Sequence, residues 1–446
     1  MAPPNPTHAA PRGRLPPSSP LPMPSSSSPL PPASSCGMFQ ERRFGLFVHW
    51  GLYALGGWHE QAQWRLDIPA QDYQEQMHRF RPDAFSASQW LDAVEEAGME
   101  YLCFTTKHHD GFCLWDTQAT DYKITRTPWG RDPLAELSRE CARRNIALSL
   151  YYSCPDWHCP YSLNFGGDHQ LPRPNPGDTP DLVKYMEYVR LQVRELCTNY
   201  GPLAQFFWDI PPGLQVPSFN EEIRRLQPGI LINNRGFGPG DYATPERHVP
   251  EGGAFTRLTE ACQSVGRRSW GYRKDEDYFS PGFLIRSMDR IFAMGGNYLL
   301  NVGPDATGTI PPQARQILRQ VGEWYRRCRE AVVLAKPAPG LVDNPEVMLT
   351  RRDSVLYAHL PQGAISTGFS LEPLAVQPLQ ATLLNTGDPL DASVELLPEF
   401  YQMGPCLVVR GLPLDKLADT APVVKLEFAP GALEEAQGKG WTPQIL

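Results

Sequence analysis

From Arg43 to Arg329, short apolar runs alternate along the chain with longer stretches of helical spacing. Apolar runs of four to eight residues are typical of buried strands, and apolar residues repeating three and four positions apart are typical of amphipathic helices. The predicted strands cover residues 44–48, 101–105, 147–151, 203–208, 230–232 and 298–302. The predicted helices cover residues 87–97, 134–145, 180–200, 221–226, 284–294 and 313–329. Strands that alternate with crossover helices predict a parallel sheet.

The number and span of these units predict an α/β fold of the (β/α)8-type barrel kind rather than an open sheet. No Gly-x-Gly-x-x-Gly follows the first strand, which argues against a dinucleotide-binding fold. Beyond Pro337 the pattern changes to short alternating strands, such as 354–360 and 423–428, with turn residues between them. We therefore expect a catalytic barrel over residues 38–336 and a small antiparallel β-sandwich domain over residues 337–446.

Residues 1–37 are dominated by Pro, Ser and Ala. Such a composition buries too little apolar surface to order itself, so we expect a disordered leader, or an artefact of a start upstream of a true start near Met38. Prolines interrupt every candidate apolar run in this segment, which argues against a secretory signal peptide. We assign no function to it.

Charge and cysteine usage narrow the possible partners and compartments. The net charge of −8 gives no support for nucleic acid or an anionic membrane as a partner, and no apolar run is long enough to span a bilayer. Of the ten cysteines, only Cys154 and Cys159 are closely spaced, which argues against a zinc site. We expect buried, reduced cysteines, which favour the cytoplasm. The sequence gives no indication of the oligomeric state.

The run 203–208 ends abruptly in Asp209, which Pro211, Pro212 and Gly213 follow closely. Burying a carboxylate at a strand end is costly unless it is used, although a single aspartate there is more often a turn or cap residue. Other strand ends carry chemically capable residues too, and in a barrel these ends gather at one face. This face is predicted to collect His49, His108, His109, Tyr152, Asp209 and Arg235. Their convergence indicates an enzyme.

A second carboxylate beside Asp209 would complete the pair that cleaves a glycosidic bond. Candidates after Arg235 are Glu246, Glu251 and Glu260. Eleven tryptophans offer platforms on which sugars stack, and no Gly-x-Ser-x-Gly elbow or phosphate loop is present. The adjacent histidines have no third metal ligand at a suitable spacing, so we expect neither a metal nor a cofactor. Retaining glycoside hydrolysis uses most of these groups.

Six stretches of the chain match the motifs of a known family. In order they are Arg43–Gly51 (RFGLFVHWG), Thr105–Asp116 (TTKHHDGFCLWD), Ile232–Arg235 (INNR), Asp241–Glu246 (DYATPE), Ser269–Tyr272 (SWGY) and Gly295–Pro304 (GGNYLLNVGP). Together they resemble the α-L-fucosidases of glycoside hydrolase family 29. The resemblance implies a barrel followed by a β-sandwich, and an exo-acting enzyme without a cofactor. It also implies double displacement that removes terminal α-L-fucosyl residues from glycoconjugates and retains the anomeric configuration.

The resemblance also assigns roles to individual positions. Asp209 matches the nucleophile, and Trp270 matches the aromatic residue that packs near the methyl group of fucose. Phe207 or Trp208 is expected to supply a second wall. The positions that hydrogen-bond the fucose hydroxyls are matched by His49, His108, His109, Tyr152 and Arg235. Where the family often has glycine after the nucleophile, this chain has Ile210.

The resemblance leaves the acid/base open between two glutamates. The stretch Thr259–Arg273 resembles a segment of animal-type members and points to Glu260, whereas other members use a glutamate that matches Glu246. We rank Glu260 ahead of Glu246, with Glu251 third. Two alternatives to a fucosidase are a carbohydrate-binding relative without turnover and a retaining glycosidase for a related sugar such as α-L-galactose.

Overall fold

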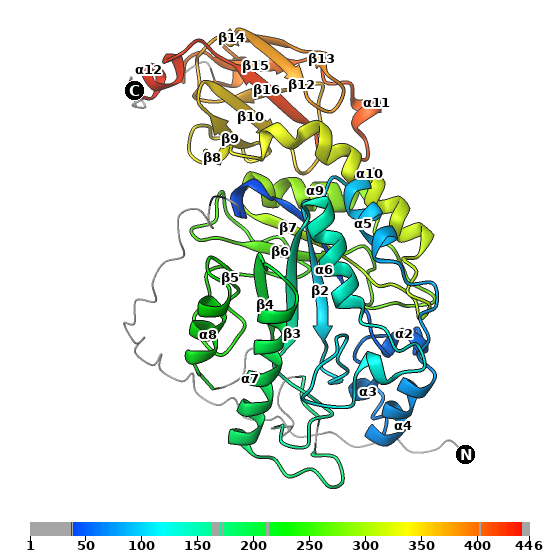
Figure 1. Cartoon of the computed structure of the whole chain (residues 1–446). Helices are drawn as coiled ribbons and strands as arrows, with labels where there is room; N and C mark the ends of the chain where they lie inside the picture. Colours follow the sequence, from blue (N-terminus) through cyan, green and yellow to red (C-terminus); the bar gives the residue numbers. More distant parts are fainter. Residues whose placement is uncertain are drawn as a thin grey trace, which may run out of the picture. The chain divides into compact units, whose positions relative to one another are not determined.

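The computed structural model describes residues 37, 39–162, 169–171, 173–210, 214–400 and 403–438. The predicted leader, residues 1–37, lies outside this range except for Gly37. A curved sheet of parallel strands forms the centre of the fold, with the larger helices packed around its outside (Figure 1). Its strands are β1 (Phe44–Val48), β2 (Tyr101–Lys107), β3 (Ala147–Ser153), β4 (Gln205–Asp209), β5 (Leu231–Ile232), β6 (Glu260–Ser264) and β7 (Asn297–Val302).

The sheet closes into a barrel through a short segment that has no helix beside it. The strand order is β5-β4-β3-β2-β1-β7-β6, which leaves a gap between β5 and β6. Residues 242–246 fill this gap, because Tyr242 bridges Asn233 after β5, and Glu246 bridges Cys262 on β6, both in parallel register. Asn234 N–H donates to Tyr242 O at 3.0 Å, and Cys262 N–H donates to Pro245 O at 2.9 Å. With this segment as the eighth position, the predicted (β/α)8-type barrel is confirmed.

Alternate residues of the strands fill the inside of the barrel, because successive side chains of a strand point to opposite faces. The interior cluster consists of Phe47, Tyr101, Cys103, Tyr151, Phe207, Cys262 and Leu299, all buried. Residues between these positions point outward and pack under the helices in a second, larger cluster. Strand register therefore decides which of two neighbouring residues points into the barrel and which points outward.

The helices begin and end where the sequence supplies the necessary caps. Ser86, Asp132, Asp181 and Ser280 each accept a hydrogen bond from a backbone N–H in the first turn of the following helix. The helices are α2 (Tyr53–Gly56), α3 (Ala62–Arg65), α4 (Ala70–Gln74), α5 (Ala87–Glu96), α6 (Pro133–Arg144), α7 (Leu182–Asn199), α8 (Ser218–Leu226), α9 (Pro281–Ala293) and α10 (Pro312–Cys328). In the part of the chain that the structure describes, no helix is long and apolar enough to cross a membrane.

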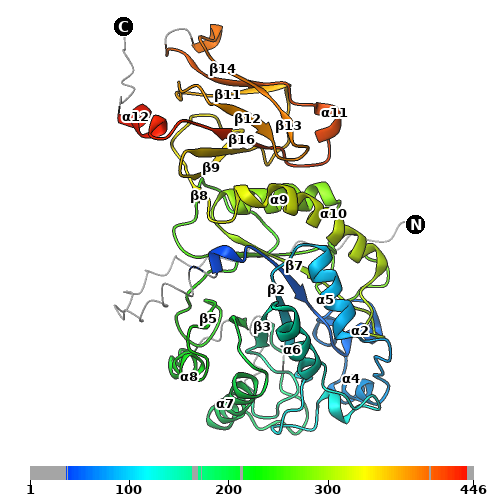
Figure 2. The same ribbon diagram turned by 45° about the horizontal axis from the view of Figure 1, so that its top comes forward.

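Antiparallel strands follow the barrel, as predicted (Figure 2). One sheet has the order β13-β12-β16-β10-β9-β8 and the other the order β11-β15-β14, with an apolar core of their own. The strands are β8 (Lys336–Pro337), β9 (Met348–Arg352), β10 (Val355–His359), β11 (Gly368–Leu371), β12 (Gln380–Leu383), β13 (Asp388–Pro389), β14 (Asp391–Glu395), β15 (Cys406–Arg410) and β16 (Val423–Glu427). Short helices α11 (Leu414–Leu417) and α12 (Ala432–Gly438) complete this part.

Candidate active site

The carboxyl ends of the barrel strands bring most of the predicted site residues together. His49 follows β1, His108 and His109 follow β2, and Asp209 is the last residue of β4. The ring centroids of His49 and His108 are 5.6 Å apart, and those of His108 and His109 are 4.0 Å apart. His109 Nε2 lies 3.8 Å from Asp209 Oδ2. These residues, scattered over 160 positions of the chain, thus share one small buried volume.

Asp209 is largely buried, and two donors hold its carboxylate. Tyr151 Oη–H donates to Asp209 Oδ2 at 2.6 Å, and Arg235 Nη1 donates to Oδ1 at 3.1 Å. Burial and the nearby Asp209 charge raise the pKa of Tyr151 well above its usual value, so the phenol remains a donor. Hydrogen bonds to both oxygens fix the orientation of the carboxylate.

Arg235 joins Asp209 to a second carboxylate, that of Glu246. The same Nη1 that contacts Asp209 also donates to Glu246 Oε1, while Nη2 donates to the carbonyl of Thr244 at 2.6 Å. Two carboxylates that share one nitrogen are close enough for the separation of about 5–5.5 Å that a retaining glycosidase pair requires. The bridged segment 242–246 delivers Glu246 to this position.

The two carboxylates have different surroundings. Glu246 keeps 39% of its side chain exposed toward the mouth of the site, against 12% for Asp209. The pKa of Glu246 is raised, chiefly because the surrounding protein removes water from it and further because Asp209 is close, although Arg235 opposes the shift. A raised pKa favours the protonated form, so Glu246 can donate a proton.

The three histidines are buried and neutral. Burial lowers the pKa of His49 to about 4, and the pKa values of His108 and His109 also fall well below the usual range, first because of burial and then because of the neighbouring rings. His49 Nδ1 is 2.7 Å from Asn301 Oδ1, and His109 Nδ1 is 2.7 Å from Ser153 Oγ. One ring nitrogen of His49 and one of His109 are thereby occupied, and the other nitrogen of each of these two rings can bond a hydroxyl group.

Trp270 forms an aromatic wall of the site. Its ring stacks on His49 with centroids 5.4 Å apart and an interplanar angle of 28°. Its backbone carbonyl accepts from Asn301 Nδ2 at 2.6 Å, and its N–H donates to Glu60 Oε2 at 3.0 Å. Phe207, an inward-facing residue of β4, contacts Phe47 and Tyr151 beside it.

Glu60 belongs to the site, although it is not among the predicted site residues. It is buried and also accepts from Ser269 Oγ and from the N–H of Gly271. Burial alone would raise its pKa, but the adjacent His59 and the hydrogen bond from the Ser269 hydroxyl outweigh that effect and lower the pKa to about 2. This buried anion fixes the loop that carries Trp270. Its only signal in the sequence is a carboxylate flanked by tryptophans in Trp58–Trp64.

Two predicted site residues point to the wrong side of the sheet. Tyr152 is fully buried among the outer packing and donates to Gln192 Oε1 at 2.6 Å while accepting from Lys107 Nζ at 2.9 Å. Trp208 is also fully buried, and its Nε1 donates to Asn220 Oδ1 on α8 at 3.0 Å. The period of two along a strand explains both corrections. Their neighbours Tyr151 and Phe207 occupy the places expected for them.

The first-ranked acid/base candidate, Glu260, lies at the opposite end of the barrel. It begins β6, is fully buried, and accepts from Tyr101 Oη at 2.5 Å and from Gln205 Nε2 at 3.0 Å. Tyr101 and Gln205 stand at the amino ends of β2 and β4, whereas Asp209 ends β4. Gly45 leaves room for the Tyr101 ring, since a Cβ there would lie 2.3 Å from it. This placement corrects the ranking and leaves Glu246 as the candidate.

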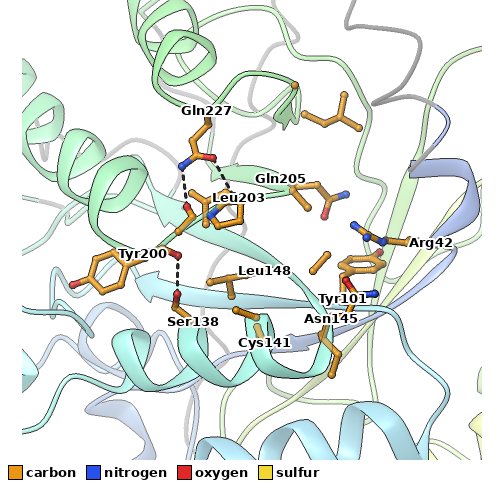
Figure 3. Close-up of a pocket in the computed structure, with 18 of the residues that line it drawn as sticks. Arg42, Tyr101, Ser138, Cys141, Asn145, Leu148, Tyr200, Leu203, Gln205 and Gln227 are labelled. Atoms are coloured by element: carbon orange, nitrogen blue, oxygen red, sulfur yellow. Dashed lines mark hydrogen bonds between the residues drawn. The ribbon is translucent and has the colours of Figure 1, made fainter.

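A cavity of about 880 Å³ opens at that same amino end. Figure 3 shows Tyr101 and Gln205 in its wall, together with Leu148, Leu203 and Gln227. Asp209, Glu246 and the three histidines do not line it. The third candidate, Glu251, is exposed in the loop before β6. Among the described residues, no three His, Cys, Asp or Glu side chains are grouped so as to hold a metal ion.

Known proteins resemble this chain over most of its length. Residues 26–330 match the profile of the family described as Alpha-L-fucosidase. The tissue α-L-fucosidase of Rattus norvegicus is 28% identical over 422 residues, which cover 84% of this chain and 87% of that protein. The α-L-fucosidase of Dictyostelium discoideum is 27% identical over 353 residues, covering 70% of this chain and 73% of the relative.

Solved structures resemble the fold over most of its length. α-L-Fucosidase isoenzyme 1 from Paenibacillus thiaminolyticus is 32% identical with a TM-score of 0.78, covering 89% of this chain and 99% of that one. A family 29 α-L-fucosidase from Bacteroides thetaiotaomicron, trapped as a covalent intermediate with 2-fluoro-fucosyl fluoride, is 25% identical with a TM-score of 0.76. The match covers 90% of this chain and 98% of that one. A covalent intermediate is what double displacement requires.

Proposed function

The chain belongs to the α-L-fucosidase family, glycoside hydrolase family 29, and we propose from that premise which residues carry out its reaction. The protein is a retaining α-L-fucosidase whose substrates are fucosylated glycoconjugates. We assign the nucleophile to Asp209 and the acid/base to Glu246. The observation that supports this pairing is the single Arg235 nitrogen that contacts both carboxylates at the mouth of the barrel.

In the first step, an Asp209 oxygen attacks the anomeric carbon of the fucosyl group and forms an ester bond to it. The bond from that carbon to the leaving oxygen breaks, and Glu246 gives its proton to this oxygen. Tyr151 and Arg235 hold the Asp209 carboxylate in its orientation before attack. When Asp209 forms the ester, it loses its negative charge. Its carbonyl oxygen, which is not bonded to the sugar, can still accept a hydrogen bond from these donors.

In the second step, the Glu246 carboxylate takes a proton from a water molecule while the water oxygen attacks the anomeric carbon. The ester bond breaks, Asp209 regains its charge, and fucose leaves with its original anomeric configuration. Glu246 ends protonated, as at the start. Its partly exposed position allows water to reach it, whereas Asp209 is more enclosed.

The remaining residues are proposed to bind the sugar. Neutral imidazoles of His49, His108 and His109 can accept or donate hydrogen bonds to its hydroxyl groups without introducing a competing charge. Trp270 and Phe207 offer apolar surface to the methyl side of fucose. A hydroxymethyl group in the same place would need a polar partner, so this wall favours fucose over α-L-galactose.

Azide rescue tests both assignments at once, using an aryl α-L-fucoside with a good leaving group. Asp209→Gly should lose nearly all activity, and azide should restore it as β-L-fucosyl azide, because azide replaces the nucleophile. Glu246→Ala should be rescued as α-L-fucosyl azide, because azide then attacks the ester intermediate. Glu260→Ala is the matched carboxylate control. Rescue of Glu260→Ala instead of Glu246→Ala would overturn the acid/base assignment, and fucose binding without turnover in the wild type would favour the carbohydrate-binding alternative.

We also propose a reducing compartment, with the cytoplasm favoured. Nine cysteines among the described residues are buried and unpaired, which is typical of proteins that mature without disulfide formation. Thiol titration of the protein purified without reductant tests this proposal, since oxidised cysteine pairs would contradict it.

The division into a barrel to residue 336 and a β domain from residue 337 remains our proposed domain organisation.

A further inference from the structure

One charged side chain beside the proposed acid has no role in the reaction described so far. Arg247 follows Glu246 directly, and its guanidinium carbon lies 4.4 Å from the centroid of the Trp270 ring. Its Nη1 donates to the carbonyls of Gly266 and Arg267 at 3.3 and 3.0 Å, in the loop between β6 and Trp270. The side chain is therefore fixed at one end by backbone oxygens and at its face by an aromatic ring.

The backbone places this guanidinium with little freedom. Arg247 N–H donates to the carbonyl of Cys262 at 2.9 Å, which pins the residue to β6. Its φ of 54° lies in the left-handed region, which residues other than glycine adopt uncommonly. Such a conformation persists where the surrounding structure imposes it, and it often accompanies a functional site. Here it sends Glu246 and Arg247 to two different parts of one site, the acid and the sugar wall.

We infer that Arg247 is a positioning residue that holds Trp270 against the fucosyl group and whose charge, next in the chain to Glu246, weakens proton binding by that carboxyl group. This inference rests on the proposed role of Glu246. A planar guanidinium over an indole ring is attracted to the ring electrons, and the two carbonyl contacts prevent it from sliding away. The wall and the acid are thereby coupled through one side chain.

The charges around both groups determine the direction of the electrostatic effect. Glu246 faces Arg235, Asp209, Tyr151 and Cys262 from the other strands. Arg247 faces Glu60 and Glu276 as well as Glu246, and it lies near His49 and His59. Among these groups, Arg235 and Arg247 are the cations that oppose proton binding by Glu246. Removing the Arg247 charge should therefore make Glu246 hold its proton to higher pH.

Two substitutions separate the two roles. Arg247→Lys keeps the charge but loses the planar stack, so KM for phenyl α-L-fucoside should rise roughly three- to tenfold with the alkaline limb of the pH profile unchanged. Arg247→Met keeps an unbranched chain over Trp270 but loses the charge. The alkaline limb of its kcat/KM profile should move up by about half a pH unit, less than a direct ion pair would give. Phenol is a poor leaving group, so the profile depends on proton donation.

Arg267→Met is the matched control, because it removes a neighbouring exposed arginine charge that does not stack on Trp270. It should change neither KM nor the alkaline limb. Arg247→Gln provides a second neutral variant if Arg247→Met does not fold, as judged by circular dichroism. Glu246→Gln shows which group causes the alkaline limb of the kcat/KM profile. If the limb disappears in this variant, it reports the titration of Glu246.

If Glu246→Gln abolishes the limb but Arg247→Met and Arg247→Gln leave it in place, the charge role of Arg247 is wrong while the proposed function stands. If Arg247→Lys has the KM of the wild type, the role in holding Trp270 is wrong. If Glu246→Gln keeps the alkaline limb, the proposed acid/base role of Glu246 and the charge role of Arg247 are both wrong. The role of Arg247 in holding Trp270 is then still tested by the KM of Arg247→Lys.

Discussion

At the scale of single residues, two adjacent tyrosines provide a direct test of which face of β3 serves the reaction. Tyr151 donates to Asp209, whereas Tyr152 donates to Gln192 behind the sheet. Tyr151→Phe should lower kcat/KM roughly 10- to 100-fold, the effect of one hydrogen bond to a charged group, with stability nearly unchanged. Tyr152→Phe should instead lower the free energy of unfolding by about 1–2 kcal/mol and keep the activity.

Kinetics and urea unfolding of both variants decide the matter. The two substitutions remove the same atom from the same residue type one position apart, so each is the control of the other. Loss of activity in Tyr152→Phe alone would mean that the outward-facing tyrosine reaches the sugar, contrary to the observed register.

Ile210 tests whether the turn after the nucleophile is strained. It directly follows Asp209 and has a φ of 56°, a conformation that a β-branched residue adopts rarely. Glycine adopts it without this penalty, so Ile210→Gly should be more stable than Ile210→Ala by about 1 kcal/mol. In an exposed helical position the order should reverse, and Gln320 in α10 provides that control, with alanine favoured by about 1 kcal/mol. Thermal melting of Ile210→Gly, Ile210→Ala, Gln320→Gly and Gln320→Ala measures both differences.

At the scale of elements, apolar runs and helical spacing were sufficient to predict six of the barrel strands and the large helices. The sequence analysis did not predict β6 or the segment 242–246. The residues of β6 are Glu-Ala-Cys-Gln-Ser, whose polar side chains are buried by the closed barrel rather than by a local apolar pattern. The sequence analysis therefore predicts Glu260 as the acid/base beside Asp209, although it begins a strand at the far end of the barrel.

The sequence could place Asp209, the three histidines and Arg235 at strand ends, because these ends are marked by the residues that stop each apolar run. The sequence could not predict which way the side chains of Tyr152 and Trp208 point. Both faces of a barrel strand are apolar, so the strand shows no alternation of apolar and polar residues. Glu60 depends on a long-range contact with Ser269 that no local pattern encodes.

The buried Glu260 makes a prediction about pH and stability. Burial raises its pKa to about 7, although Tyr101 and Gln205 oppose the shift by hydrogen bonding. The folded state therefore binds a proton that the unfolded chain has released above about pH 4, so stability falls as pH rises from about 4 to 7 and is then constant. Glu260→Gln removes this loss and should be more stable than the wild type at pH 8, by on the order of 2–3 kcal/mol.

Urea unfolding of Glu260→Gln and wild type at pH 4.5 and pH 8 measures the effect, and the difference should be small at the lower pH. Activity should remain, because Tyr101 and Gln205, not the substrate, contact this side chain. An inactive but stable Glu260→Gln would restore the original ranking of the acid/base candidates.

At the scale of the whole molecule, the change of pattern near Pro337 predicts where the β domain starts but not how it is attached. The apolar cluster around the barrel includes Tyr357, Ala421 and Val423 from the β domain. His359 Nδ1 lies 2.6 Å from Asp289 Oδ1 on α9, with both side chains fully buried, and Trp324 Nε1 on α10 donates to Ala421 O at 2.8 Å. Buried polar pairs of this kind lose their partners if the two parts separate, which favours joint unfolding.

We therefore expect the chain from the barrel to the β domain to unfold in one transition, and Phe369→Ala tests this. Phe369 is buried in the separate core of the β domain, where its loss should cost about 3–5 kcal/mol. If the parts are coupled, the whole calorimetric transition moves to lower temperature, and heat inactivation of the active site in the barrel moves with it. If the parts are independent, a second transition appears and the temperature of inactivation stays that of the wild type. Because Phe369 belongs to a cluster separate from the one around the barrel, a shift in the inactivation temperature would show that the two parts unfold together.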